Sequence, residues 1–189
     1  MTPPSVAVLL AAGGGSRFTA SGHKLLAPLR GRPVWQWALE AVVAAGFDHV
    51  VVVTGAVTLD VPPPAVEHRN ARWHDGQATS LHVAIAAAEQ LGAVAVTVGL
   101  ADQPFVPTST WLAVAGAPPD QPIVIATYDG VPGPNPVRLA QEVWPLLPTT
   151  GDLGARDVIR EHPEWVSGVA CLGSTADIDT LEDLDRWNR

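Results

Sequence analysis

Runs of apolar residues alternate with amphipathic stretches along most of the chain. Four runs are apolar at nearly every position, at residues 5–12, 49–55, 93–104 and 122–130, and a shorter strand is expected at 65–70. Continuous Val, Ile, Leu and Ala without polar alternation are typical of strands that are covered on both faces of a parallel sheet. The pattern therefore predicts a sheet buried between two layers of helices.

The stretches between these strands have the spacing of helices. Gly46 and Gly92 follow two of them, at the positions where helices commonly stop. The alternation of strand and helix predicts an α/β fold, with a three-layer αβα arrangement around a mostly parallel, Rossmann-like sheet, as one domain over residues 1–189. The expected helices cover residues 34–46, 79–92, 108–116, 139–147, 151–163 and 180–188.

The charge and cysteine content narrow the classes of partner. The chain has 11 basic and 19 acidic residues and a formal net charge of −8, which argues against nucleic acid or an anionic membrane as a partner. Cys171 is the one cysteine, so neither an internal disulfide nor a cysteine metal cluster is expected. No run approaches the roughly 20 apolar residues that span a bilayer. We expect a soluble, cytoplasmic protein.

The chemistry is expected in the loops that follow the strands, because ligands of such sheets bind beyond the carboxyl ends of the strands. In the first loop Gly13–Gly15 precede Arg17 and Lys24, and Lys24 is the only lysine in the chain. Glycines let backbone N–H groups crowd around an anion, while a guanidinium and a compact ammonium supply positive charge. The loop is therefore predicted to hold phosphate, and a Gly-rich turn with two solvated cations is the alternative. The expected loops cover residues 12–24, 55–58, 70–80, 100–106, 129–136 and 173–179.

Two familiar glycine-loop motifs do not fit this segment. Gly13, Gly15 and Phe18 approximate the dinucleotide-binding fingerprint, but its third glycine is missing and no acidic residue follows the second strand. The Walker A pattern fails because Leu25, rather than Ser or Thr, follows Lys24. The loop is therefore expected to bind phosphate in another way.

Six motifs occur in the order of one known family. The chain reads "LAAGGGSRF…HKLLAPLRGRPV", "NARWHDGQATSLHVAI", "GLADQPFV", "GVPGPNPVRL", "GDLGARDVIREHP" and "DIDTLEDL". Together these motifs resemble the MobA-like nucleotidyltransferases, and most closely the molybdenum cofactor cytidylyltransferases. The resemblance implies transfer of a nucleoside monophosphate from a nucleoside triphosphate to a phosphorylated acceptor, with release of pyrophosphate and without a protein nucleophile. Magnesium and cationic side chains would neutralise the reacting phosphates.

The resemblance also implies roles for particular residues. Arg17, Lys24 and Asp102 are the expected catalytic groups, and Asp102 would also bind Mg²⁺. Asp179 or Asp177 is the expected second metal ligand, although an aspartate before "TLEDL" is also an ordinary helix N-cap. The nucleotide is expected to contact Ala11, Ala12, Gly13, Gly14, Gly15, Ser16, Asn70, Gly76 and Ser80, and Trp73 lies in the same base-side loop.

Two features depart from the family pattern, and a third, Ala12, bears on the choice of nucleotide. Arg17 and Lys24 stand seven positions apart, further than in relatives, with "FTASGH" between them. Asn135 replaces a histidine that is common at its position, and with Gln103 it is the expected contact of the acceptor. Ala12 stands where guanylyl-transferring members usually have glycine, which leaves less space for a purine and favours CTP over GTP.

Two other functions stay open. One is the same chemistry with GTP or with a phosphorylated acceptor other than molybdopterin. The other is a nucleotide- or cofactor-binding module that delivers its ligand without catalysis, which should keep its nucleotide affinity after Asp102→Ala. The retention of both Lys24 and Asp102 favours an enzyme. Transient contact with an enzyme that accepts the finished cofactor is also expected.

Overall fold

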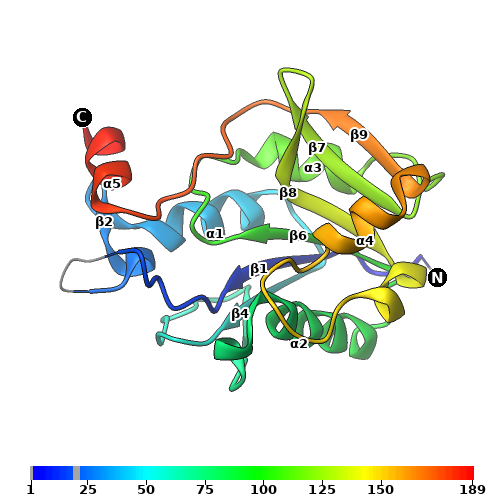
Figure 1. Cartoon of the computed structure of the whole chain (residues 1–189), viewed down its shortest axis with the longest axis horizontal. Helices are drawn as coiled ribbons and strands as arrows, with labels where there is room; N and C mark the ends of the chain where they lie inside the picture. Colours follow the sequence, from blue (N-terminus) through cyan, green and yellow to red (C-terminus); the bar gives the residue numbers. More distant parts are fainter. Residues whose placement is uncertain (1, 19–21) are drawn as a thin grey trace.

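The computed structural model describes residues 2–18 and 22–189 (Figure 1). Residues 19–21, which belong to the long segment between Arg17 and Lys24, lie outside the described residues. The strands of the main sheet are β1 (Val6–Ala11), β4 (His49–Thr54), β5 (Val66–Arg69), β6 (Ala95–Leu100), β7 (Ile123–Tyr128), β8 (Val131–Ala140) and β9 (Val166–Ala170), and a separate hairpin joins β2 (Pro28–Leu29) to β3 (Arg32–Pro33). The α-helices are α1 (Val34–Ala44), α2 (Gln77–Gln90), α3 (Thr108–Ala115), α4 (Arg156–Glu161) and α5 (Leu181–Asn188). The 3-10 helices are η1 (Lys24–Leu26), η2 (Trp73–Asp75), η3 (Gln141–Leu146) and η4 (Pro163–Trp165).

The main sheet has seven strands in the order β5-β4-β1-β6-β8-β7-β9. β1 pairs in parallel with β4 and with β6, and β4 pairs in parallel with β5. β8 runs antiparallel to both β6 and β7, whereas β7 and β9 are parallel. Because β1, β4 and β6 are neighbours that run in the same direction, the loops after them meet at one edge of the sheet.

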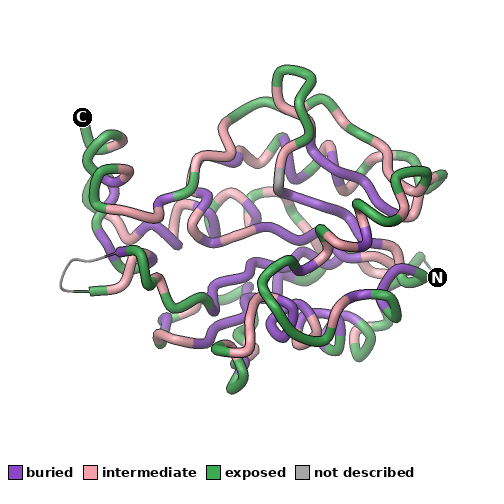
Figure 2. The backbone as a smooth tube through the Cα atoms, viewed as in Figure 1, coloured by how far each residue is buried: buried purple, intermediate pink, exposed green. Residues whose placement is uncertain are grey.

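The sheet is covered by helices on both faces, which confirms the predicted three-layer αβα fold. All six residues of β1 are buried, and alternate residues belong to different cores. Val8 joins a core with residues of α2, η3 and α4, whereas Leu9 joins a core with residues of α1 and α3. Figure 2 shows this burial along the central strands, with exposed residues concentrated in loops and on the outer sides of helices. Within the described residues, no helix is long and apolar enough to cross a membrane.

Several expected elements are wrong in detail. Residues 129–136 are not mainly a loop, because β8 begins at Val131. The sequence did not predict this strand because the segment contains three prolines, and proline has no N–H to donate to a sheet ladder. The expected helix at 139–147 is instead the end of β8 followed by η3. The expected helix at 151–163 is α4 alone, because Gly151 and Gly154 both have positive φ and keep the segment before it as a loop. The strand β9 had no clear apolar signal, and much of it is half-buried or exposed.

The start of the last helix settles which residue caps it. Thr180 is the N-cap of α5, and its hydroxyl accepts a 3.1 Å hydrogen bond from the backbone N–H of Asp183. The Asp183 carboxylate in turn accepts a 2.9 Å hydrogen bond from the Thr180 N–H, which completes a capping box. Asp179 therefore precedes the cap, and its carboxylate is available for other contacts.

Candidate active site

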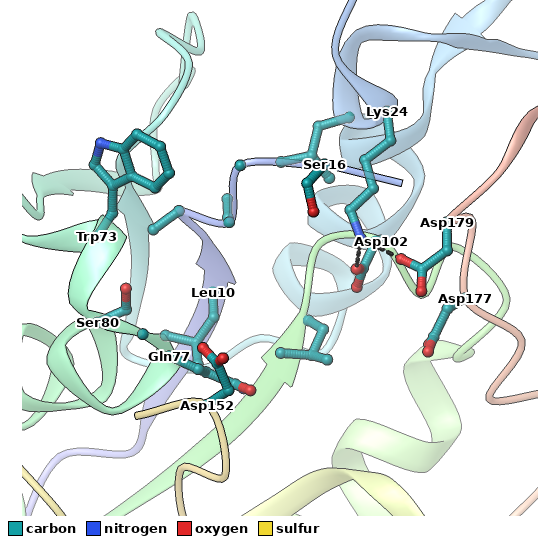
Figure 3. Close-up of a pocket in the computed structure, with 18 of the residues that line it drawn as sticks. Leu10, Ser16, Lys24, Trp73, Gln77, Ser80, Asp102, Asp152, Asp177 and Asp179 are labelled. Atoms are coloured by element: carbon teal, nitrogen blue, oxygen red, sulfur yellow. Dashed lines mark hydrogen bonds and ion pairs between the residues drawn. The ribbon is translucent and has the colours of Figure 1, made fainter. Parts of the chain in front are cut away.

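A cavity of about 530 Å³ lies at the carboxyl ends of β1 and β6. Ligand-binding clefts in proteins commonly have volumes of roughly 300–1,000 Å³. Figure 3 shows Lys24, Asp102, Asp177 and Asp179 on one side of the cavity and Trp73, Ser80, Gln77 and Asp152 on the other. The lining residues are Leu10, Ala11, Ala12, Gly13, Gly14, Gly15, Ser16, Arg17, Lys24, Leu25, Trp73, His74, Gly76, Gln77, Ser80, Leu100, Asp102, Asp152, Arg156, Asp177 and Asp179.

The glycine loop that follows β1 forms one wall of the cavity. The carbonyl of Ala12 accepts a 3.1 Å hydrogen bond from the N–H of Ala56, and the carbonyl of Gly15 accepts one of 2.9 Å from Phe18. Gly15 has φ of 60°, a conformation that glycine adopts without steric cost. Backbone carbonyls are thus engaged by the protein at both ends of the loop, which suits a segment whose N–H groups are to face an anion.

Trp73, at the start of η2, packs directly against this loop. A Cβ placed on Gly14 would lie 2.9 Å from the Trp73 ring, and one placed on Gly55 would lie 2.6 Å from the Trp73 Cβ. Only glycine allows such close approach at these two positions. The indole is thereby held at the cavity wall, where an aromatic face can stack on a nucleotide base.

Lys24 lies at the opposite side of the cavity, where it contacts two carboxylates (Figure 3). Its Nζ is 2.5 Å from Oδ2 of Asp102 and 2.5 Å from Oδ1 of Asp179. The lysine side chain is only 12% exposed. Burial alone lowers the pKa of Lys24, but the charges and hydrogen bonds of Asp102 and Asp179 outweigh that effect, and the pKa is raised. The ammonium form is therefore the stable one at neutral pH.

Arg17 extends the cluster toward solvent. One guanidinium nitrogen of Arg17 lies 2.8 Å from Oδ2 of Asp179, so that this carboxylate is shared by Arg17 and Lys24. The Arg17 side chain is 76% exposed. An exposed ion pair of this kind is weak, and the guanidinium can leave it for a phosphate at little cost.

The C-terminal segment before α5 is docked beside Asp102 by backbone and side-chain contacts. The N–H of Ile178 donates a 2.9 Å hydrogen bond to the carbonyl of Asp102, and the Ile178 side chain is fully buried. Nε2 of Gln103 donates a 2.6 Å hydrogen bond to Oδ1 of Asp177. Burial raises the pKa of Asp177, and the charges of Asp102 and Asp179 add to the rise. This docking brings Asp177 and Asp179 to the same side of the cavity as Asp102, which is distant from them in the sequence.

Gln103 supports the site from behind. Gln103 is 2% exposed, and its side chain is hydrogen-bonded to Asp177. Among the described residues, Oε1 of Gln103 has no hydrogen-bond partner. The structure thus brings Gln103 next to a cavity-lining carboxylate without making it part of the lining, so its expected contact with the acceptor stays a prediction.

Asn70 also has a supporting position. It is 3% exposed, and its Nδ2 donates to the hydroxyls of Thr79 at 2.8 Å and Ser80 at 2.9 Å. Its Oδ1 accepts a 2.8 Å hydrogen bond from the N–H of Arg72. Asn70 therefore fixes the loop that carries Trp73 to the first turn of α2. Ser80 does line the cavity, as the sequence predicted for a nucleotide contact.

The loop before α4 closes the cavity on the side of Gln77. Gly151 accepts a 2.9 Å hydrogen bond from Ala78 and donates one of 2.9 Å to the carbonyl of Asp75. A Cβ on Gly76 would lie 2.4 Å from the backbone of Gly151, so these two loops require glycine at Gly76. This docking brings two further charged residues to the lining, Asp152 and Arg156.

Sequence reasoning did not select Gln77 or Arg156 as site residues. The available signal was the "GDLGAR" motif, whose Gly151 and Asp152 fit a helix start and a contact of the acceptor equally well. Asn135, which was selected, is 6% exposed and lines a separate cavity of about 30 Å³ next to the main one. Arg156 lines both cavities and connects the predicted acceptor residue to the larger site.

The described residues contain no group of three or more His, Cys, Asp or Glu side chains arranged to hold a metal ion. The fold and the site together define the class of protein. Nucleotide-binding α/β proteins have a glycine loop after the first strand of a parallel sheet, and here cations and carboxylates lie beside that loop. Residues 7–165 match the family of the MobA-like NTP transferase domain, and the chain belongs to that family.

Similarity extends over almost the entire length of the chain. It is 31% identical to nicotine blue oxidoreductase of Paenarthrobacter nicotinovorans, over 97% of this chain and 96% of that protein. The solved structure of Rv0371c from Mycobacterium tuberculosis H37Rv has a TM-score of 0.80 and 28% identity, over 99% of this chain and 98% of that one. A nucleotidyl transferase from Methanothermobacter thermautotroptrophicus has a TM-score of 0.79 and 25% identity, over 98% and 96% of the two chains.

Proposed function

We propose that this protein transfers CMP from CTP to a phosphorylated acceptor, of which molybdopterin is the favoured example, and releases pyrophosphate. An oxygen of the acceptor phosphate attacks the α-phosphorus of CTP, and the bond from that phosphorus to the pyrophosphate oxygen breaks. One observation carries the proposal: the only lysine meets Asp102 and Asp179 beside a glycine loop, in a cavity of nucleotide size. Membership of the NTP transferase family supports a nucleoside triphosphate as the donor.

The two cations of the glycine loop have complementary tasks in this reaction. Lys24 is a compact charge held at the carboxylate cluster, next to the position of the reacting phosphate. Arg17 is exposed and can grip the outer phosphates with two parallel hydrogen bonds. Catalysis is then mainly positioning and neutralisation of charge, which explains why a protein nucleophile is not needed.

Asp102 and Asp179 fit the binding of Mg²⁺. Both carboxylates are ion-paired to the same ammonium nitrogen, so their oxygens lie close together, and Mg²⁺ would bind them when Lys24 turns from the pair toward the phosphates. Mg²⁺ is commonly bound by only one or two protein carboxylates and takes its other ligands from substrate phosphates and water. Two carboxylates therefore suffice even though the described residues form no larger metal cluster. The ion would neutralise the phosphates, while Lys24 and Arg17 would orient them.

The base-side wall supports CTP as the donor. Trp73 offers an aromatic face, and Ser80 and Gln77 offer polar groups that can bond the edge of a base. The methyl group of Ala12 occupies the corner where β1 ends, and a Cβ on the adjacent Gly55 would lie 2.8 Å from it. This corner is thus filled by side-chain atoms, which favours a pyrimidine over a purine.

The acceptor is assigned to the side of Arg156 and Asn135. Arg156 presents a guanidinium to the main cavity, and guanidinium groups bind phosphate with two parallel hydrogen bonds. Asn135 stands in the adjoining small cavity. A phosphorylated acceptor held there would lie near Gln77, which lines both cavities. Delivery of the product to a cofactor-accepting enzyme would follow release.

The decisive experiment measures pyrophosphate release with each of the four ribonucleoside triphosphates and a panel of phosphorylated acceptors that includes molybdopterin. We expect turnover with CTP and Mg²⁺, a loss of orders of magnitude in Lys24→Ala, and a weakened response to Mg²⁺ in Asp102→Asn. Glu89→Gln makes the same carboxylate-to-amide change on the exposed end of α2 and is the matched control. Wild-type rates in Lys24→Ala would refute the role of the lysine, and preference for GTP would refute the argument from Ala12.

Two alternatives have their own outcomes in this experiment. A binding module would take up CTP, keep that affinity after Asp102→Ala, and release no pyrophosphate with any acceptor. The 31% identity to nicotine blue oxidoreductase favours a redox activity as a second candidate. Reduction of nicotine blue by an added reductant, without any pyrophosphate release, would support that candidate instead.

A further inference from the structure

His23 contacts the glycine loop at the backbone of Gly13. Its Nε2 lies 2.8 Å from the carbonyl oxygen of Gly13, and its Nδ1 accepts a 3.3 Å hydrogen bond from the N–H of Leu25. Because Nδ1 must be unprotonated to accept from an N–H, the ring proton of the neutral imidazole is on Nε2. Nε2 therefore donates its hydrogen bond to the Gly13 carbonyl, and both ring nitrogens have defined partners.

This hydrogen bond sets the direction of the peptide between Gly13 and Gly14. In a trans peptide, the carbonyl oxygen and the following N–H point in opposite directions. Gly13 and Gly14 line the cavity, whereas His23, which contacts the Gly13 carbonyl, is not among the lining residues. The Gly13 carbonyl thus points to a side chain outside the lining, which leaves the Gly14 N–H, on the opposite side of the peptide, free to face the cavity. A carbonyl oxygen facing the cavity would repel an anion, and an N–H attracts one.

The peptide needs such a restraint because glycine stands on both sides of it. Without a Cβ, either flanking residue can rotate with little steric cost. The neighbouring carbonyls of Ala12 and Gly15 are restrained by backbone N–H groups. The Gly13 carbonyl is restrained by a side chain instead. The ring of His23 also supports the next residue, because a Cβ on Gly15 would lie 3.2 Å from Nε2.

We propose that His23 is a positioning residue that orients the Gly13–Gly14 peptide to bind the phosphates of the nucleoside triphosphate. The proposal rests on the proposed function, because it assigns the triphosphate to this loop. Burial lowers the pKa of His23, which agrees with a neutral ring that accepts at one nitrogen and donates at the other. His23 makes no direct contact with substrate in this role and acts through the loop.

Two substitutions separate the two hydrogen bonds of the ring. In His23→Gln, the side-chain amide nitrogen takes the place of Nε2 and can still donate to Gly13. In His23→Asn, the shorter side chain can still accept from Leu25 but does not reach Gly13. The control is His49→Asn, since His49 is an exposed histidine at the first residue of β4, at the opposite end of the strand from the cavity.

The experiment measures the affinity of each variant for Mg²⁺·CTP and for inorganic tripolyphosphate by titration calorimetry, with KM and kcat from pyrophosphate release. We expect His23→Asn to weaken both ligands and raise KM roughly threefold to tenfold, the range of one hydrogen bond, with a smaller change in kcat. His23→Gln and His49→Asn should bind like the wild type. Thermal unfolding of each variant checks that the fold persists.

Other outcomes overturn the proposal. If the wild type binds CTP and His23→Asn binds both ligands equally well, His23 does not orient the loop, while the proposed function stands. If CTP is weakened but tripolyphosphate is not, the histidine acts on the base and not on the phosphates. If His23→Gln is as weak as His23→Asn, the donor at Nε2 is not the cause. If the wild type binds neither ligand, the proposed function fails as well.

Discussion

Replacement of Lys24 by methionine tests the charge cluster directly. Methionine keeps an unbranched apolar stem and removes the positive charge. In the wild type, the Nζ of Lys24 lies 2.5 Å from one oxygen of Asp102 and 2.5 Å from one oxygen of Asp179, so those oxygens are no more than twice that distance apart. Without the ammonium, the two carboxylates face each other across the vacated position.

The expected loss of stability follows from that separation. Two negative charges about 5 Å apart repel by about 3 kcal/mol at an effective dielectric constant of about 20. The side chains of Asp102 and Asp179 are 17% and 18% exposed, so water screens this repulsion only in part. Rotation of the carboxylates relieves some of it, and Arg17, which is exposed and lies 2.8 Å from Asp179, offsets a further small part. We therefore expect Lys24→Met to lower the free energy of unfolding by about 2–3 kcal/mol.

The pKa of Lys24 also predicts how this loss of stability depends on pH. The pKa of Lys24 is raised above its ordinary value of 10.5 in the folded protein. A group with a raised pKa stabilises the fold fully below its unfolded pKa and loses that contribution only as the pH rises through the folded value. Lysine remains charged throughout the neutral range, so the difference between wild type and variant should be constant between roughly pH 6 and pH 9.

Urea unfolding followed by circular dichroism measures the effect, for Lys24→Met, Asp179→Asn and the double variant. The double variant should be more stable than Lys24→Met, because the amide removes the repulsion with Asp102. A double-mutant cycle then gives the coupling between Lys24 and Asp179. Stability within about 0.5 kcal/mol of the wild type in Lys24→Met, or no recovery in the double variant, would refute the reasoning.

Three further predictions concern other parts of the site and its support. Trp73→Ala should weaken CTP binding roughly fivefold to a hundredfold in calorimetric titrations, the range of base–aromatic stacking, whereas Trp73→Phe should retain most of the affinity; equal affinity in all three proteins would exclude stacking. Gly76→Ala should lower the free energy of unfolding by more than about 2 kcal/mol in urea, because its φ is 104° and its Cβ would lie 2.4 Å from Gly151; an unchanged midpoint would contradict the close approach of the two loops. Asp183→Asn should lower stability at neutral pH by roughly 0.3–1 kcal/mol, because it keeps an oxygen acceptor but removes a negative charge from the first turn of α5. The Thr180 hydroxyl lowers the pKa of Asp183, so its carboxylate stabilises the fold above the ordinary pKa of 3.8 and stops doing so as the pH falls through the lower folded value; a difference from the wild type that persists in strong acid would contradict this assignment.

The sequence was most informative where a local pattern has only one low-energy solution. Uninterrupted Val and Leu in β1 and β4 can be buried only in a sheet covered on both faces, and the αβα architecture followed from such runs. It was least informative where distant contacts override local preference. The prolines of β8 disfavour a strand, yet that segment pairs with both β6 and β7. Local pattern carries no information about such pairing partners.

The candidate site divides in a similar way. Gly13–Gly15, Arg17 and Lys24 were selected from residue type and position after a strand, and Asp102 was selected from the family resemblance; all of them line the cavity. Gln103 and Asn70 were selected from motifs, but their side chains are buried and hold Asp177 and the Trp73 loop in place. A motif identifies which residues matter, whereas the direction of each side chain depends on neighbours that the motif does not contain.

The sequence alone determined the layers of the fold, the loop that is expected to hold phosphate, and the residues that carry charge at the strand ends. Only the tertiary structure decided which of these charges meet. The docking of Ile178 against the backbone of Asp102, and the cap at Thr180, turn Asp179 toward Lys24 across 155 positions of sequence. The physical reason is that strand burial and helix capping depend on residues close together in the sequence, so short patterns predict them. An ion pair between distant residues depends on the three-dimensional path of the chain between its partners.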